Sequence, residues 1–195
     1  MDSEARNNPE KSENIFLGYL KDFSIILSII MVLFFLLFRI IVVSGDSMYD
    51  TLHDGDLLLL SSRVFYHNPE QGDIIVASKE SFRDGEPIIK RVIAVEGQTV
   101  HIDFPNGIVY VDGVALDEPY ISSLTMRQEG MTFPLTVDPG CVFVMGDNRD
   151  DSWDSRSVEI GLIDERQILG KAIILFFPAE NHYGERDFSR IGVLK

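Results

Sequence analysis

Two short segments of the chain contain side chains that could carry out acyl transfer together. The first is Ser44 to Leu52, S-G-D-S-M-Y-D-T-L, in which Ser47 follows Gly-Asp and precedes Met. A serine on a tight turn can act as a nucleophile, and its own backbone N–H can help to bind an oxyanion. Serine beside glycine and aspartate is also common in ordinary turns, so this segment alone does not establish a site.

The second segment is the apolar run Ile88 to Val95, I-I-K-R-V-I-A-V, which contains Lys90. In a strand, Lys90 would share one face with Ile88, Val92 and Ala94. Burial on such a face lowers the pKa of a lysine from about 10.4, and a shift of about three units would make the amine a general base near neutral pH. The alternative is an edge-strand lysine whose ammonium group stays in water.

A third segment, Gly146 to Arg156, reads G-D-N-R-D-D-S-W-D-S-R. Its acidic residues do not fit a calcium loop of the EF-hand type, which needs acids at alternate positions and a glycine at the sixth. Asp154 and Arg156 are better interpreted as an internal ion pair. Taken alone, the segment could equally be a solvated acidic loop.

Other catalytic patterns are missing from the sequence. There is no G-x-S-x-G or H-E-x-x-H motif, and the single Cys141 excludes a disulfide framework and a zinc site built from several thiolates. The four histidines leave a Ser-His-Asp triad formally open, but none lies in a motif: His53, His67, His101 and His182. A Ser/Lys pair needs only two side chains, and we expect no metal and no cofactor.

The N-terminal part of the chain predicts a membrane anchor. Residues 1–23 are polar, whereas the twenty residues from Ser24 to Val43 contain one charge, Arg39. A helix of that length rises about 30 Å, enough to cross the hydrocarbon core of a bilayer. A buried core helix would show a polar face, and a cleavable signal peptide has a shorter apolar region of about 7–15 residues. Arg39 lies near the end of the span and can extend to the interface.

Charge predicts the orientation of this anchor and excludes one class of partner. Lys11 and Lys21 precede the span, and only Arg63 is basic within twenty residues after it, which favours a cytoplasmic N-terminus and an extracytoplasmic domain at the plasma membrane. The whole chain carries a net charge of −14. Such a field repels phosphate backbones, so we expect no nucleic-acid partner.

Residues 44–195 are expected to form a mostly β domain, a sandwich or barrel, because short apolar runs alternate with turn signals. Asp112-Gly113 predicts a two-residue hairpin turn, and Ile163 to Leu169 is expected to be helical. Residues 103–140, more polar from Asp117, are expected to be a small flap or insert. The predicted strands are Leu57–Leu60, Asp73–Ala77, Ile88–Val95, Thr99–Ile102, Ile108–Val111, Cys141–Met145 and Ala172–Phe177.

The order of these segments resembles that of bacterial type I signal peptidases, a family of membrane-anchored serine proteases. The third segment matches every fixed position of the family's G-D-N-R-x-x-S-x-D-S-R box. The likeness covers residues 24–177. The other similar boxes are Ser44–Leu52, Gly72–Val76 (G-D-I-V-V in the family), Lys90–Gln98 (K-R-V-I-G-x-x-G-D) and Ile168–Ala172 (I-V-G-K-A).

The resemblance implies a role for each matching residue. Ser47 would be the nucleophile, Lys90 the general base, and Ser152 the hydroxyl that orients the lysine amine. Asp147, Asp154 and Arg156 would be structural supports. The oxyanion hole would use the Ser47 backbone N–H, because Gly45 stands where some relatives have a hydroxyl.

Three positions depart from the family pattern. Asp50 replaces the usual Pro, Ala94 replaces a Gly, and Gln98 replaces an Asp. Asp50 matters most, since it loosens the turn beside Ser47 and adds a negative charge. None of the three removes the nucleophile or the base, so activity is still expected.

The resemblance also implies the substrate: secretory preproteins embedded in the lipid bilayer, cut after the A-x-A pattern of signal peptides through an acyl-enzyme. Apolar pockets for the small side chains could be lined by Ile74, Val76, Ile88 and Val92. One alternative is a self-cleaving repressor-type protease, but no DNA-binding domain is visible. The other is a non-catalytic or specialised anchored relative that serves pilus or substrate assembly, which Asp50 keeps open.

Overall fold

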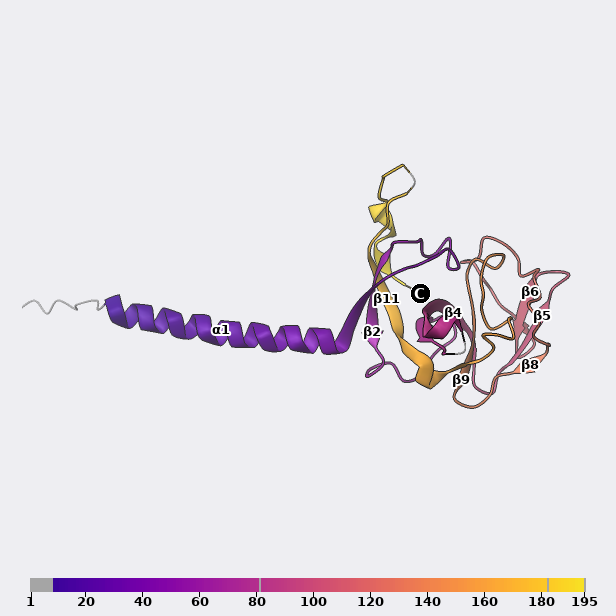
Figure 1. The fold of residues 1–195 in the computed structure, drawn as a ribbon, viewed down its shortest axis with the longest axis horizontal. Coiled ribbons are helices and arrows are strands. Elements are labelled where there is room, and N and C mark those ends of the chain that lie inside the picture. The colour runs from indigo at the N-terminus through magenta and orange to yellow at the C-terminus, as the bar shows by residue number, and fades with distance from the viewer. Residues whose placement is uncertain (1–8, 81, 182, 195) are drawn as a thin grey trace, which may run out of the picture. The chain divides into compact units, whose positions relative to one another are not determined.

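A computed structural model describes residues 9–80, 82–181 and 183–194 (Figure 1). Its internal contacts divide the chain into two units, an N-terminal helix that ends at Leu37 and a β domain that begins at Phe38.

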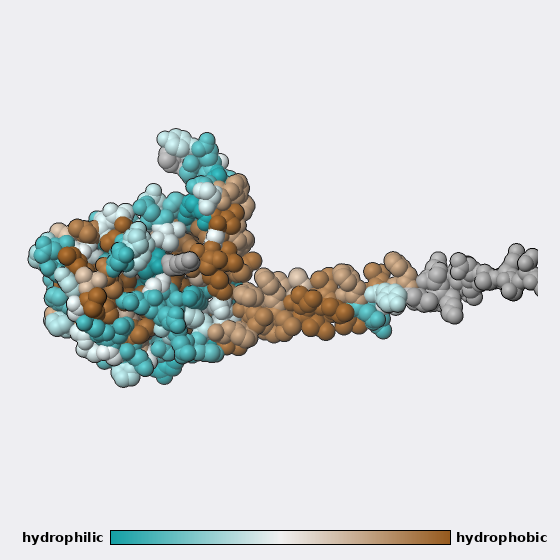
Figure 2. All heavy atoms as spheres, turned by 180° about the vertical axis from the view of Figure 1, so that it is seen from behind, coloured by the Kyte–Doolittle hydropathy of each residue, from teal (hydrophilic) through white to brown (hydrophobic). Residues whose placement is uncertain are grey.

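The N-terminal unit is the helix α1, Pro9–Leu37, which is 29 residues long. Its stretch Phe16–Leu37 has a mean hydropathy of 2.4 and is long and apolar enough to cross a membrane. Figure 2 shows apolar side chains along this part of the helix. Part of the expected polar tail, residues 1–8, lies outside the described residues, and the rest of it is already helical from Pro9.

The helix ends earlier than the predicted span of 24–43. Residues Phe38–Val42 form strand β1, in which Arg39 pairs with Leu60 and Ile41 with Leu58. Apolarity alone does not distinguish a membrane helix from a strand, and the β-branched run Ile40 to Val42 favours the extended form once a partner strand is available.

The larger sheet of the β domain has eight strands in the order β1-β2-β11-β3-β4-β9-β10, with β12 paired to β11. All its pairs are antiparallel, which fits the predicted β architecture. Its remaining strands are β2 Leu57–Ser62, β3 Ile74–Ser78, β4 Pro87–Val95, β9 Cys141–Met145, β10 Ile163–Asp164, β11 Ile168–Phe177 and β12 Gly192–Val193.

The smaller sheet has four strands in the order β7-β6-β5-β8 and contains part of the predicted insert at residues 103–140. The Asp112-Gly113 turn joins β6 to β7 with positive φ angles of 53° and 79°, as a two-residue hairpin requires. The predicted turn is therefore confirmed. The strands of this sheet are β5 Thr99–Asp103, β6 Ile108–Val111, β7 Val114–Ala115 and β8 Leu135–Thr136.

Strands β3 and β4 are buried on both faces. Ile74 and Val76 belong to one apolar cluster, whereas Ile75 belongs to a second. On β4 the register shifts between Val92 and Ala94, so these two residues enter different clusters and do not continue the single face expected from strict alternation. A bulge of this kind inserts a residue and reverses the side-chain alternation beyond it.

The seven predicted strands are all present, but the helix expected at Ile163 to Leu169 is wrong. That segment holds the two-residue β10, a single 3-10 turn at Glu165–Gln167 and the start of β11. Asp164 caps the turn by accepting a hydrogen bond from Arg166 N. Ile168 then pairs with Ala77 of β3, and sheet pairing ends the helical turn.

Candidate active site

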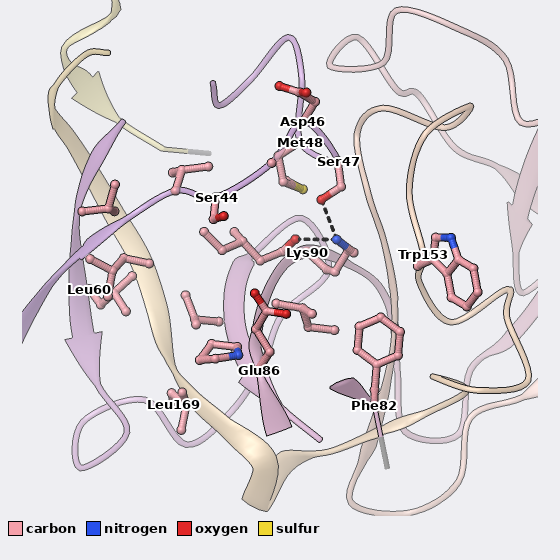
Figure 3. A pocket seen from close by; sticks show the side chains of 18 of the residues that line it. Ser44, Asp46, Ser47, Met48, Leu60, Phe82, Glu86, Lys90, Trp153 and Leu169 are labelled. Carbon is pink, nitrogen blue, oxygen red and sulfur yellow. Dashed lines mark hydrogen bonds between the residues drawn. The ribbon is translucent and has the colours of Figure 1, made fainter. Parts of the chain in front are cut away.

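Ser47 and Lys90 meet at one edge of a groove, although 43 residues separate them in the chain. Lys90 Nζ lies 2.6 Å from Ser47 Oγ and also donates a 3.0 Å hydrogen bond to the Ile89 carbonyl (Figure 3). The Lys90 side chain comes from β4, and the residue is only 4% exposed. A lysine amine and a serine hydroxyl at this distance can exchange a proton.

The loop that carries Ser47 is anchored by its neighbours. Gly45, with φ of 85°, begins the turn, and Leu52 N donates to the Met48 carbonyl at 2.9 Å. Met48 and Leu52 are buried in the same apolar cluster as Leu60. Ser47 itself is half-buried and points toward the groove.

The loop Gly146 to Arg156 packs directly behind the Ser47 loop. Asn148 N donates to the Ser47 carbonyl at 3.1 Å, and its side chain donates to the Asp46 carbonyl. A Cβ atom on Gly146 would lie 2.4 Å from the Ser47 carbonyl oxygen and 2.2 Å from Ser152 Oγ. Only glycine at this position lets the two loops approach so closely.

Asp154 and Arg156 form an ion pair inside the Gly146 to Arg156 loop, and both side chains are fully buried. Asp154 accepts hydrogen bonds from Gly146 N at 3.0 Å and from Arg156 Nε at 2.9 Å. Burial alone would raise the pKa of Asp154, but the hydrogen bonds and charge of Arg156 outweigh it and lower the pKa. Arg156 also donates to the Arg149 carbonyl at 3.0 Å, which holds the loop closed.

Asp147 connects this loop to the elements that carry Lys90 and Ser47. It accepts two hydrogen bonds from Arg91, at 2.8 and 2.7 Å, and one from Thr51 Oγ1 at 2.5 Å. Arg91 follows Lys90 on β4, and Thr51 lies on the Ser47 loop. Sequence analysis did not identify Arg91 or Thr51; an arginine in an apolar strand was a usable signal, because a buried charge requires a partner.

Ser152 lies beside this arrangement without being hydrogen-bonded to it. Its Oγ is buried and has no hydrogen-bond partner among the described residues, so it does not bond the Lys90 amine in this structure. A buried hydroxyl without a partner is unusual in folded proteins.

The groove has a volume of about 480 Å³ and is mostly apolar, with Leu60 and Leu169 at one end and Phe82 and Trp153 at the other. Of the four predicted pocket residues, Val76 and Ile88 line it. Ile74 and Val92 do not line it, and they belong to two separate core clusters. Three carboxylates also line the groove: Asp46, Glu86 and Asp151.

Known proteins resemble this chain over most of its length. The family model described as "Signal peptidase, peptidase S26" matches residues 16–177. The chain belongs to the signal peptidase family. The chain is 34% identical over 190 residues to a signal peptidase I of Bacillus amyloliquefaciens and 35% identical over 190 residues to signal peptidase I T of Bacillus subtilis; each comparison covers 91% of this chain and 96% of the relative.

Two further matches extend this comparison. A probable signal peptidase I-1 of Synechocystis is 41% identical over 145 residues, which cover 70% of each chain. A crystal structure of a signal peptidase I from Enterococcus faecalis is 30% identical with a TM-score of 0.46, covering 53% of this chain and 96% of that one. With its apolar helix, this family member is a membrane-anchored serine peptidase.

The histidines of the alternative triad have other neighbours. His53 stacks on Tyr49 with ring centroids 4.8 Å apart, and His101 lies 5.9 Å from the Tyr110 ring. His67 is exposed, and His182 lies outside the described residues. Within the described part of the chain, no group of three or more His, Cys, Asp or Glu side chains could hold a metal ion.

The predicted insert contributes supports that sequence analysis did not find. Arg149 pairs with Glu118 and donates a 2.5 Å hydrogen bond to Thr125 Oγ1. The Tyr120 ring lies 4.0 Å from the Arg91 guanidinium. These contacts attach residues 118–125 to the Gly146 to Arg156 loop and to Arg91 of β4. No local sequence pattern indicates such partners, since they are brought together only by the fold.

Proposed function

We propose that this family member removes signal peptides from exported preproteins through a Ser47/Lys90 dyad. The observation that carries the proposal is the 2.6 Å contact between the Ser47 hydroxyl and a buried lysine amine at the edge of an apolar groove. No histidine or metal is needed for this chemistry, because the neutral amine supplies the base.

In the proposed reaction, Lys90 takes the Ser47 hydroxyl proton while Oγ attacks the scissile carbonyl carbon. The Ser47 backbone N–H donates to the oxyanion that forms. Lys90 then returns the proton to the leaving amine, which frees the mature protein and leaves an acyl-enzyme. Water attacks the ester carbonyl, with Lys90 again accepting the proton. Collapse of this second intermediate breaks the Oγ–C bond, Lys90 returns the proton to Ser47 Oγ, and the signal peptide leaves with a free carboxyl terminus.

Ser152 is proposed to orient the Lys90 amine during this cycle. Its hydroxyl is buried, has no hydrogen-bond partner among the described residues, and lies on the loop that packs against Ser47, so a bond to the amine would break none that Ser152 Oγ makes in this structure. Asp147, Asp154 and Arg156 are proposed to hold the loop in shape and to take no part in proton transfer.

The groove supports recognition of the A-x-A pattern. Val76 and Ile88 present apolar walls next to Lys90, which suits small side chains at the residue before the cut and at the residue two before that. Replacing Ile88 by alanine should relax this preference and admit larger residues. Unchanged preference in Ile88→Ala and Val76→Ala variants would contradict this assignment.

We propose that the N-terminus is cytoplasmic and the β domain extracytoplasmic at the plasma membrane, on the basis of Lys11 and Lys21, which lie in the N-terminal half of α1. A protease added to intact cells should then digest the β domain and spare the N-terminal tail. Digestion of the N-terminal tail alone would show the opposite orientation.

The test of the function is cleavage of an A-x-A preprotein by the full chain in detergent, with product N-termini mapped. Cleavage after the small residue, abolished by both Ser47→Ala and Lys90→Ala, is the expected result. Cleavage that survives Lys90→Ala would overturn the dyad. If the wild-type chain cleaves no preprotein, cleavage by the Asp50→Pro variant would indicate a specialised relative with another substrate. No cleavage by either chain would indicate a non-catalytic relative.

A further inference from the structure

We infer that Ala179 and Phe188–Leu194, in the C-terminal segment, form a clamp that positions the Ser47 loop, with Arg190 as its positioning residue. The inference rests on the proposed role of Ser47. It concerns a part of the chain beyond the family match, which ends at Phe177.

Arg190 forms an ion pair with the buried carboxylate of Asp56, at the end of the Ser47 loop. It lies in the 3-10 turn Phe188–Arg190, and its Nη1 and Nη2 donate to Asp56 Oδ1 at 3.1 Å and Oδ2 at 2.6 Å. The Asp56 side chain is fully buried, and that of Arg190 is 17% exposed. Two parallel bonds between an arginine fork and a carboxylate form the most directional ion pair available to side chains.

Asp56 in turn closes the loop around Ser47. Its carboxylate accepts a 2.8 Å hydrogen bond from His53 N, and its carbonyl accepts one of 2.8 Å from Val43 N. The clamp supplies a further donor, Ala179 N, at 2.8 Å. Burial would raise the pKa of Asp56, but the hydrogen bond from Arg190 and those from the backbone lower it, so the carboxylate is charged and needs these donors.

The clamp also reaches the turn next to the nucleophile. Arg190 Nη2 lies 3.4 Å from the Thr51 carbonyl, and Thr51 is the residue whose hydroxyl binds Asp147. Further along, Leu194 packs against the apolar cluster that contains Met48, the residue after Ser47. Leu194 N donates to the Ile173 carbonyl at 2.9 Å, which fastens this end of the clamp to β11.

Release of the clamp should therefore shift Ser47 Oγ relative to Lys90 Nζ while the groove walls formed by Val76 and Ile88 stay in place. Arg190 is absent from the groove lining. A misplacement of about 1 Å between reacting groups can cost about 100-fold in rate. The expected signature is a fall in kcat with little change in KM.

The experiment compares Arg190→Ala and Arg190→Lys with a matched control, Arg186→Ala, in the full chain in detergent. Arg186 belongs to the same segment, but it donates to the Pro178 carbonyl and to Glu180 and stacks on Phe177. We expect Arg190→Ala to lower kcat about 10- to 100-fold at unchanged KM. Lysine at 190 should recover part of the loss, and Arg186→Ala should keep the wild-type kcat.

Hydrogen–deuterium exchange of peptides that cover residues 43–56 tests the clamp without relying on activity. Exchange there should accelerate in Arg190→Ala and not in Arg186→Ala. Equal exchange and equal kcat in Arg190→Ala and Arg186→Ala would overturn the clamp. If Arg190→Ala does not fold, the same two measurements on Arg190→Lys and Arg186→Ala test the clamp instead. If the wild-type chain cleaves no preprotein, the proposed function fails, while the exchange comparison still decides whether the clamp exists.

Discussion

Two Asp-x-Arg segments of this chain, Asp154-Ser155-Arg156 and Asp164-Glu165-Arg166, form the same local ion pair in different surroundings. In each, the arginine backbone N–H and Nε donate to one carboxylate oxygen and Nη2 donates to the other. The pair at 154 is fully buried, whereas Arg166 is 82% exposed. In both, the hydrogen bonds from arginine lower the pKa of the aspartate, at Asp164 to about 2.

The difference shows that local sequence determines the geometry of such an ion pair, whereas burial determines how much the loss of one partner destabilises the protein. An exposed pair is screened by water and salt and contributes little to stability. A buried pair that loses one partner leaves an uncompensated charge, which is strongly destabilising. The buried pair lies behind the Ser47 groove, where it holds the loop that carries Asp147 and Ser152.

The largest expected effect is that of Asp154→Ala. It leaves the Arg156 charge buried, so we expect the free energy of unfolding to fall by about 3–5 kcal/mol. Urea denaturation of the full chain in detergent measures the change. If Asp154→Ala lowers the free energy of unfolding no more than Asp164→Ala does, burial does not make the first pair more important for stability than the second.

Acid should act through the same buried pair. Because the pKa of Asp154 in the folded protein is below its ordinary value of 3.8, its carboxylate adds stability above that pH, and this contribution is lost as the pH falls below 3.8 through the folded-state pKa. The stability difference between the wild-type chain and Asp154→Ala should therefore narrow below pH 3.8. A difference that stays constant down to pH 2 would contradict the assigned ionisation.

Ser152→Ala separates the support function of the loop from its proposed role in catalysis. The Ser152 hydroxyl has no hydrogen-bond partner among the described residues, so its removal should leave the melting temperature unchanged. Preprotein cleavage should fall about 10- to 100-fold, at or below the lower end of the roughly 100- to 10,000-fold that general-base catalysis contributes, because Ser152 only orients the base. Ser152→Thr, which keeps the hydroxyl, is the matched control. Full activity in Ser152→Ala would show that the lysine needs no such partner.

The smallest effect is expected at the exposed pair. Asp164→Ala should leave both the cleavage rate and the melting temperature at wild-type values, because water already solvates Arg166. The Asp164 side chain also caps the turn at Glu165–Gln167, and a measurable drop in melting temperature that salt does not alter would assign stability to this cap.

Sequence analysis identified the strands well because their signal is local. The run Cys141–Met145 is β9 with the same bounds, and Asp112-Gly113 is the hairpin turn. It placed the end of the apolar helix at Val43 instead of Leu37, since both helices and strands can be built from apolar residues. It also assigned a helix to Ile163–Leu169, where pairing with β3 prevails over a single helical turn.

The candidate site was likewise predicted only in part from the sequence. Ser47 and Lys90 were named from their residue types and from the resemblance, and Ser152 from the resemblance alone. The fold brings Ser47 and Lys90 into contact. Ile74 and Val92 were expected in the pocket from alternation alone, but sheets buried on both faces give each side of a strand an apolar environment. The partners of Arg91 and Arg190 could not be named from the sequence, because they lie 56 and 134 residues away.

The sequence by itself therefore determined the chemistry available to this protein: one apolar helix, short β strands, a serine, a lysine and a loop with an Asp-x-Arg pair. Only the tertiary structure decided which of these groups act together. Side-chain type and spacing control local hydrogen bonds and turns, whereas burial and long-range pairing control which charges lose their water. That is why one Asp-x-Arg pair lies on the surface and the other is buried behind the serine.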